Sequence, residues 1–168
     1  RFLSKLQYPY AQTMLSNAVA DDDEYWPAFK DLARSFYEQG PDRFSPAIAV
    51  YADALKKRPD EDHLVEGLGD AYADMGKTRT NLYSKAFAQY QRVGELLPKS
   101  ARPYFKSMAL IARPEYARPR KRHDLLLAYK EAQKREPDAV DPIAMTAMAR
   151  YILDQKAGIG APGIDDPG

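Results

Sequence analysis

Hydrophobic positions recur at intervals of three and four residues along most of the chain, which is the spacing of one face of an α-helix. The clearest stretch is 65–98, whose two stripes are, in order, Val65, Leu68, Gly69 and Tyr72, then Ala86, Tyr90 and Val93. Gly69 leaves room for a second helix to approach closely. Gly76 predicts the end of the first helix, as a glycine able to take a positive φ, and Pro98 ends the second. The pattern predicts two antiparallel helices packed along a seam of small and large side chains.

The same two stripes recur on both sides of this stretch. The other first-helix stripes are Phe29, Leu32, Ala33 and Phe36, and then Tyr104, Met108 and Ile111. The other second-helix stripes are Tyr8, Ala11, Leu15 and Ala18, then Ala47, Tyr51 and Ala54, then Leu125, Tyr129 and Ala132. A last helix over roughly 142–155 is rich in Ala and Met, and 157–168, with four Gly and two Pro, predicts a disordered tail. The acidic runs 21–24 and 60–62 are expected to cap the helices that follow them.

Helix pairs repeated in this way resemble the tetratricopeptide repeat (TPR), a helix–turn–helix unit of about 34 residues. The spacings along the register Phe29, Val65, Tyr104 and Ile143 are 36, 39 and 39 residues, and the extra residues fall between the two helices of each pair. The resemblance covers roughly 8–155 and implies an all-α, right-handed superhelical array. It implies one domain over 1–156, made of a half repeat (1–23), repeats 26–61, 62–100 and 101–139, and a closing helix (140–156).

Three departures from the repeat pattern predict irregular packing toward the end of the chain. Val65 takes the usual aromatic position, and Ser107 and Met108 replace a Leu-Gly pair. In the last helix, Thr146 stands where a large apolar residue is expected.

Composition narrows the class of protein. The chain has 168 residues, a net charge of +1 and no cysteine, which excludes disulfides, thiolate nucleophiles and zinc–cysteine sites. No apolar run approaches the roughly 20 residues that span a bilayer. No catalytic constellation, cofactor motif or metal-ligand spacing emerges. We expect a soluble, non-catalytic protein in an unknown compartment, and the missing cysteines and initiator Met favour an exported or processed chain.

The resemblance implies a concave groove lined by the first helices of the repeats. The residues expected in this partner-binding groove are Lys30, Arg34, Tyr37, His63, Glu66, Asp70, Asp74, Arg102, Phe105, Lys106, Met148 and Tyr151. The predicted groove is basic in the first repeat, acidic in the second, basic in the third and apolar at its end. This alternation suits a protein or peptide surface of mixed charge and would repel phosphates at the second repeat.

The resemblance also suggests a carboxylate clamp, the set of Lys, Asn and Arg residues with which chaperone-binding TPR proteins bind a C-terminal carboxylate. Lys30, Arg102 and Lys106 would supply its basic residues. However, Arg34 and Gly67 stand where asparagines are expected, so solvated side chains on an open groove are the better interpretation.

The longest insertion, 113–124, is strongly basic. It contains Arg113, Arg118, Arg120, Lys121 and Arg122 and carries a local charge of +3. One interpretation is a docking loop for an acidic partner, an anionic surface or nucleic acid. The other is a solvated loop beside the next helix, and the sequence leaves both open.

The sequence therefore predicts an interaction scaffold or adaptor, or a structural subunit of a larger assembly, that binds a protein or peptide partner. The alternative is a binder of anions through the basic loop. The half repeat at the start and the Met-rich last helix are expected to leave apolar ends, which either are capped locally or stack on another chain.

Overall fold

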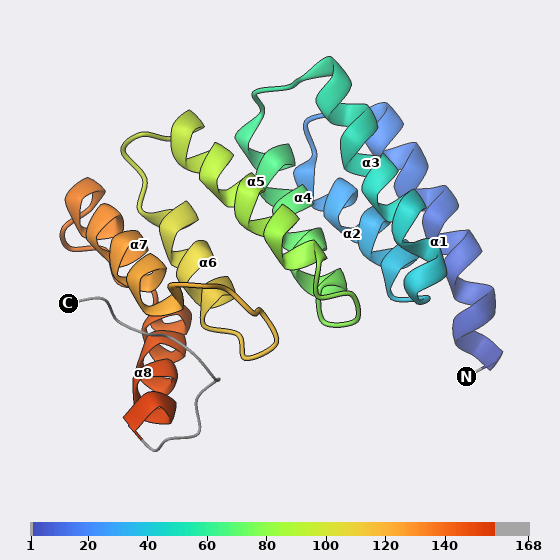
Figure 1. Cartoon of the computed structure of the whole chain (residues 1–168). Coiled ribbons are helices and arrows are strands. Elements are labelled where there is room, and N and C mark those ends of the chain that lie inside the picture. Colours follow the sequence, from blue (N-terminus) through green and yellow to red (C-terminus); the bar gives the residue numbers. More distant parts are fainter. Residues whose placement is uncertain (1, 157–168) are drawn as a thin grey trace. The chain divides into compact units, whose positions relative to one another are not determined.

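The computed structural model describes the backbone of residues 2–156 and the side chains of 7–153, and the predicted disordered tail lies outside the described residues. The described chain is all α-helical (Figure 1). Its elements are α1 (Phe2–Asp21), α2 (Trp26–Tyr37), η1 (Pro41–Arg43), α3 (Phe44–Lys57), α4 (Asp62–Met75), α5 (Leu82–Leu96), α6 (Arg102–Ile111), α7 (Lys121–Arg135) and α8 (Pro142–Lys156). The prediction of an all-α chain of helix pairs is confirmed. No helix within the described range combines the length and the apolar character that crossing a bilayer requires.

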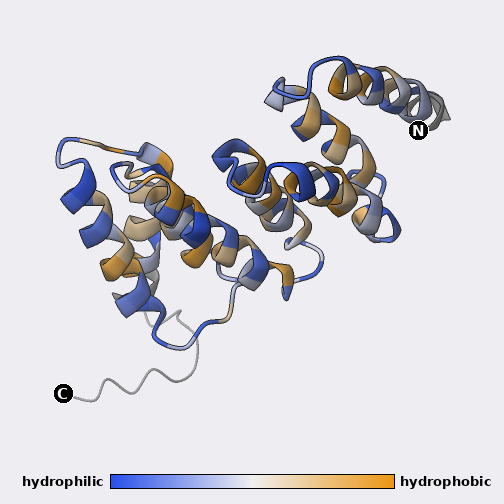
Figure 2. Ribbon diagram, turned by 90° about the horizontal axis from the view of Figure 1, so that it is seen from above, coloured by the Kyte–Doolittle hydropathy of each residue, from blue (hydrophilic) through white to orange (hydrophobic). Residues whose placement is uncertain are grey.

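Contacts between Cα atoms divide the chain into two compact units, Arg1–Leu96 and Leu97–Gly168, called unit 1 and unit 2. In unit 1, each helix from α1 to α5 packs against the next, and α2 also contacts α4. In unit 2, α6 packs against both α7 and α8. Around several of the ribbons, hydrophobic positions lie on one side and hydrophilic ones on the other (Figure 2), as the spacing of the sequence predicts. The repeat boundaries and the single-domain organisation stay predictions.

The cores of the two units consist largely of the predicted stripes. Buried side chains of unit 1 include Phe29, Leu32, Ala47, Tyr51, Val65, Leu68, Tyr83, Ala86, Tyr90 and Val93. Those of unit 2 include Phe105, Met108, Ile111, Leu125 and Ala132. The stripes are buried because a spacing of three or four residues brings these positions onto the helix face that meets the neighbouring helix.

Helix α4 lies at the centre of unit 1, and two of its glycines receive tyrosine rings from the helices on either side. A Cβ added to Gly67 would lie 2.6 Å from a ring carbon of Tyr51 in α3. A Cβ added to Gly69 would lie 2.8 Å from a ring carbon of Tyr90 in α5. Both distances are shorter than non-bonded contacts of a real Cβ atom. The close helix approach predicted at Gly69 is therefore confirmed, and a second close approach occurs at Gly67.

Gly76 ends α4 for a reason other than the predicted one. Its φ of −59° and ψ of −24° are ordinary helical values, so the prediction of a positive φ is wrong. A Cβ at Gly76 would lie 2.4 Å from both Cδ1 and Cε1 of the fully buried Tyr83 ring. The glycine is required by the packing of this ring. A positive φ does occur at Gly40, where φ is 124° immediately before η1.

The acidic runs before α2 and α4 do not cap these helices as predicted, since neither N-cap residue makes a side-chain capping hydrogen bond. The carboxylates instead contact arginines of the second helix of the same pair. Arg58, which follows α3, pairs with Asp23 at 2.7 Å. Arg92 in α5 pairs with Asp60 at 2.8 Å and also donates to the carbonyl of Pro59 at 3.0 Å. These contacts tie the start of one helix to the end region of its partner.

In the α6–α7 pair of unit 2, other contacts join the start of the first helix to the end of the second. Arg135 donates to the carbonyl oxygen of Leu97 at 3.1 Å, and its guanidinium lies 4.5 Å from the ring centroid of Tyr104. The next residue, Glu136, accepts a hydrogen bond from the backbone N–H of Ala101 at 2.6 Å, at the start of α6. All three described pairs are therefore joined at the end opposite their connecting loop.

Candidate functional site

Seven of the predicted groove residues lie together in unit 1, on α2 and α4. We call them the first-helix face: Lys30, Arg34, Tyr37, His63, Glu66, Asp70 and Asp74. The three on α2 and the four on α4 are spaced three or four residues apart, so each set follows one side of its helix. Helices α2 and α4 contact each other, and the Tyr37 hydroxyl of the first set reaches Asp74 of the second.

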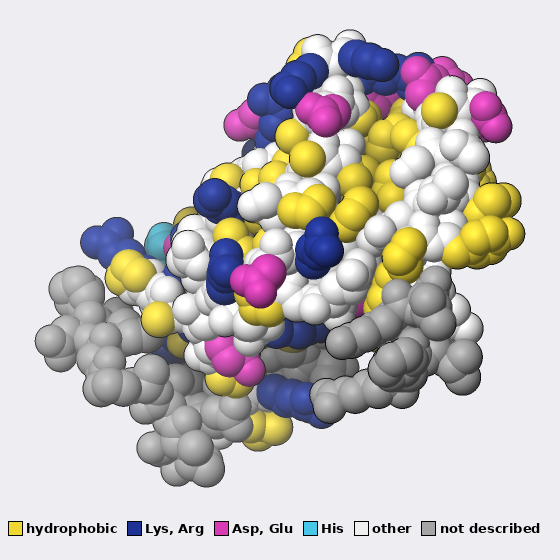
Figure 3. Space-filling view, turned by 90° about the vertical axis from the view of Figure 1, so that its right-hand side faces the viewer, with side chains coloured by type: hydrophobic (Ala, Val, Ile, Leu, Met, Phe, Trp, Pro, Cys, Tyr) yellow, Lys and Arg dark blue, Asp and Glu magenta, His cyan; other side chains and the backbone are white. Residues whose placement is uncertain are grey.

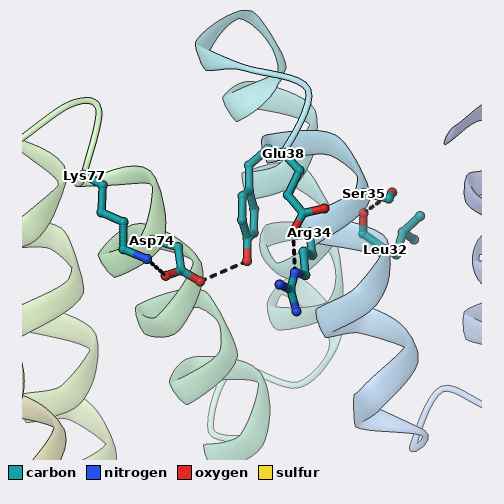
Figure 4. Close-up of polar contacts among 7 residues, drawn as sticks. Leu32, Arg34, Ser35, Glu38, Asp74 and Lys77 are labelled. Carbon is teal, nitrogen blue, oxygen red and sulfur yellow. Dashed lines mark hydrogen bonds and ion pairs between the residues drawn. The ribbon is translucent and has the colours of Figure 1, made fainter. Parts of the chain in front are cut away.

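A polar network bridges the two helices at the C-terminal end of this face (Figure 4). The Tyr37 hydroxyl donates to Oδ2 of Asp74 at 3.1 Å, and Lys77 pairs with Oδ1 of the same carboxylate at 2.9 Å. Arg34 pairs with Glu38 at 2.6 Å. Burial, followed by the nearby Asp74 charge, raises the pKa of Tyr37 well above its ordinary value, so the phenol remains a neutral donor.

This network changes the electrostatic picture obtained from the sequence. The sequence suggested a basic patch on α2 and an acidic one on α4. In the structure, Arg34 pairs with Glu38 one turn along α2, and Asp74 pairs with Lys77, which lies just beyond the end of α4. The charges on this end of the first-helix face are therefore balanced locally, and the face presents paired, oriented polar groups.

The middle of α4 is partly enclosed. Asp70 is half-buried and accepts a hydrogen bond from the Tyr90 hydroxyl of α5 at 2.9 Å. Burial and then the Asp70 charge raise the pKa of Tyr51, whose ring packs on Gly67. Glu66 is half-buried as well. The acidic residues predicted for the second repeat are thus partly enclosed, and Asp70 contacts a tyrosine of the core.

The N-terminal end of the first-helix face contains an aromatic contact that the sequence analysis missed. Trp26, the only tryptophan of the chain, stacks on His63 with ring centroids 5.9 Å apart and an interplanar angle of 23°. The Arg58 guanidinium lies 5.8 Å from the Trp26 ring centroid. The side chain of Lys30, one turn further along α2, is exposed. The available signal was the position of the lone tryptophan three residues before the core residue Phe29.

The other five predicted groove residues lie in unit 2, namely Arg102, Phe105 and Lys106 on α6 and Met148 and Tyr151 on α8. Phe105 is only 6% exposed, so its ring belongs to the core and offers no open surface. Lys106, Met148 and Tyr151 are half-buried, and Arg102 is exposed. A partner-binding role for the accessible residues stays a prediction.

The basic loop is an ordered part of unit 2, anchored by the buried ring of Tyr116. Arg118 pairs with Asp124 at 2.8 Å and donates to the Tyr116 hydroxyl at 3.0 Å. Lys121 donates to the carbonyl oxygen of Arg113 at 2.5 Å. Arg118 and Lys121 therefore hold the connection between α6 and α7.

The remaining positive charge of the loop is smaller than the sequence suggests. Lys121 is 9% exposed, burial lowers its pKa, and its Nζ lies 5.7 Å from the ring centroid of Tyr151. Arg120, with a φ of 59°, and Arg122 are exposed, and Arg113 is half-buried. Tyr116, which organises the loop, was not identified from the sequence. Within the described residues, no group of three or more His, Asp and Glu side chains is placed to hold a metal ion.

No protein-family model matches the chain, and no curated protein matches it. Among solved structures, it is similar to a thermophilic TPR protein of Thermus thermophilus, with a TM-score of 0.59 and 17% sequence identity. The match covers 92% of this chain and 77% of that one. At this identity the likeness shows the fold: the chain has a TPR-like, all-α fold, as the resemblance in its sequence implied.

Proposed function

We propose that the protein is a non-catalytic scaffold or adaptor that binds a protein or peptide partner through the first-helix face of unit 1. The observation that supports this most is the hydrogen-bonded network of Tyr37, Asp74 and Lys77, which orders polar side chains on an accessible face of a TPR-like fold. Side chains that are already ordered cost less conformational entropy when a partner binds.

The chemistry of this face favours a partner with mixed polar groups. Arg34 and Asp74 are charge-compensated, so a partner of high net charge would gain little and would have to displace existing ion pairs. Directional hydrogen bonds to the Tyr37 hydroxyl and to the paired side chains suit an extended peptide or a polar helix face. Binding of this kind should depend only moderately on salt, because the local charges already balance.

Binding of nucleic acid or an anionic surface through the basic loop has less support. The alternative needs a cluster of free cations, whereas Arg118 pairs with Asp124 and Lys121 is buried. A role as a structural subunit of a larger assembly is compatible with the proposed scaffold, because such a subunit also holds its neighbours through exposed helix faces.

The proposal can be tested with two charge-reversal variants that are matched in charge and exposure. The first is Lys30→Glu with Arg34→Glu, on the first-helix face. The control is Lys57→Glu with Lys56→Glu, on α3. Each pair contains one lysine or arginine in an exposed ion pair with a residue three or four positions away, Arg34 with Glu38 and Lys56 with Asp53, and both variants change the net charge equally.

The assay is affinity purification from an extract of the cells that express the protein, followed by titration of the purified partner. We expect the first variant to lose the partner and the control to retain it, at low and at moderate salt. A partner retained by the Lys30/Arg34 variant with unchanged affinity would contradict the proposal. Loss of a partner only after substitution of Arg120 and Arg122 would favour the basic loop instead.

A further inference from the structure

Helix α1 has an outer surface whose composition differs from the rest of the protein. From Gln7 to Ala20 it contains no charged residue, although 29% of the residues in the chain are charged. Tyr10 is 72% exposed and Met14 is 53% exposed. On the side of the molecule that carries α1, hydrophobic side chains are prominent on the described surface; charged side chains crowd its upper end, and several more lie in its middle and lower parts (Figure 3). A helix face that remains in water normally carries charged side chains.

Comparison with the other second helices shows that α1 is incompletely covered. In the second-helix stripes of α3 and α5, Ala47, Tyr51, Ala86, Tyr90 and Val93 are at most 4% exposed, and Ala54 is half-buried. The corresponding stripe of α1, Tyr8, Ala11, Leu15 and Ala18, is only half-buried. Helix α1 packs on α2, and Tyr10 and Met14, on another side of α1, remain exposed. One side of α1 is therefore open to a further helix.

The exposed residues form a seam with the spacing of a coiled coil. Gln7, Tyr10, Met14 and Asn17 follow one another at intervals of three, four and three residues, which keeps them on one stripe of the helix. The stripe is symmetric about Gln12. If a second α1 packs antiparallel with Gln12 at the centre, Tyr10 meets Met14 and Gln7 meets Asn17.

These pairs are chemically complementary. A methionine sulfur beside an aromatic ring is a favourable contact. The amides of Gln7 and Asn17 can each donate and accept hydrogen bonds. Because the seam carries no charge, two copies meet without repulsion, and the same patch serves both partners, as the two-fold symmetry of most homodimers requires.

We propose that α1 is a self-association surface on which a second copy of this chain packs antiparallel through Tyr10 and Met14. The helix has 20 residues and so is about 30 Å long. One helix pair of this length buries less area than the roughly 1,600 Å² of a standard interface, so the dimer should be weak and concentration-dependent.

The open groove between α1 and α3 is a separate surface. It has a volume of about 240 Å³ and is lined by Ser16 and Val19 of α1 and by Val50 and Ala54 of α3, among others. Ser16 lies two residues from Met14 and so points to another side of the helix. A charged substitution at Ser16 therefore tests whether association uses the groove, and a charged substitution at Met14 tests whether it uses the seam.

The first test is sedimentation velocity of the full chain over a wide concentration range. The wild type should show a reversible monomer–dimer equilibrium. Met14→Glu, which places a charge in the seam twice per dimer, should weaken association by at least about tenfold. Ser16→Glu should behave as the wild type. A wild type that stays monomeric, or Met14→Glu that associates normally while Ser16→Glu does not, would overturn the proposal.

The second test determines the register and uses the absence of native cysteines. A mixture of Tyr10→Cys and Met14→Cys chains should form an intermolecular disulfide, because these positions face each other in the proposed pair. Either chain alone should not, because identical positions are displaced by about 6 Å along the helix axis in addition to the spacing between the two helices. Their Cα atoms therefore lie more than about 7 Å apart, beyond the reach of a disulfide. Efficient crosslinking of Met14→Cys to itself would contradict the antiparallel arrangement. Circular dichroism checks that each variant folds, and Met14→Gln provides an uncharged second substitution.

Discussion

Replacing Gly76 by alanine should destabilise unit 1, although alanine is the better helix former. The new Cβ would lie 2.4 Å from two ring carbons of Tyr83 and 3.1 Å from the carbonyl oxygen of Tyr72. Carbon atoms pack at about 3.5 Å or more, so the ring has to move by about 1 Å. Tyr83 is fully buried, which leaves little free space for this movement.

The loss of stability expected for Gly76→Ala is the balance of two opposing contributions. Overpacking a well-filled core typically costs about 1–3 kcal/mol, and the buried ring places this case near the upper end. Because φ at Gly76 is −59°, alanine meets no backbone strain and recovers at most about 1 kcal/mol of helix propensity. We therefore expect a net loss of about 2 kcal/mol.

Urea unfolding followed by far-UV circular dichroism measures this loss. With an m-value of about 1.5 kcal/mol/M, the unfolding midpoint should fall by roughly 1.3 M. In a Tyr83→Leu background the ring is absent, so Gly76→Ala should be neutral or slightly stabilising. The coupling energy of this double-mutant cycle should be about 2 kcal/mol. Gly40→Ala serves as a control, since its φ of 124° predicts a loss from backbone strain that does not depend on Tyr83. Wild-type stability of Gly76→Ala, or the same loss in both backgrounds, would refute the steric explanation.

Three further predictions follow from the contacts described above. Arg58→Ala should lower the free energy of unfolding by about 1 kcal/mol, and Arg92→Ala by less than about 0.5 kcal/mol. The difference is expected because Arg58 also covers Trp26 and is less exposed than Arg92. Equal shifts of the two variants in thermal melts would count against it. Tyr116→Ala should cost about 3 kcal/mol and make the α6–α7 connection sensitive to limited proteolysis, and an unchanged digestion pattern would show that the ring does not anchor the loop. The free energy of unfolding should fall as the pH rises above about 10. Burial and the Asp74 charge raise the pKa of Tyr37 in the folded state, so the unfolded chain releases the phenol proton at a lower pH than the folded chain does. Urea midpoints on either side of this pH should differ less for Tyr37→Phe, and an identical fall in the variant would exclude Tyr37 as a source.

The helices and their seams could be predicted because local spacing determines which side chains share a face. Tyr90 and Gly69 were placed on facing stripes from their sequence positions alone, and the structure brings them into contact. The reason for Gly76 could not be predicted, because a glycine at a helix end is equally compatible with a positive φ and with a ring packed against it. Only the position of the Tyr83 ring distinguishes the two.

Side-chain contacts between residues distant in sequence also could not be predicted from the sequence. The acidic runs looked like helix caps because capping is a local interaction, whereas Asp23 contacts Arg58, 35 residues away. The basic loop looked like a cluster of free charges because the sequence gives no exposure. Its Lys121 is buried and its Arg118 pairs with Asp124 once the ring of Tyr116 is placed in the core of unit 2.

The most direct test of the proposed partner-binding face is site-specific photo-crosslinking. A photoreactive amino acid replaces Lys30 on α2 in one chain and Lys56 on α3 in another, both exposed positions. Each chain is irradiated with the purified partner, and the adduct is quantified. We predict an efficient adduct from position 30 and little from position 56. Equal adducts from the two positions, or an adduct from position 56 alone, would contradict binding at the first-helix face.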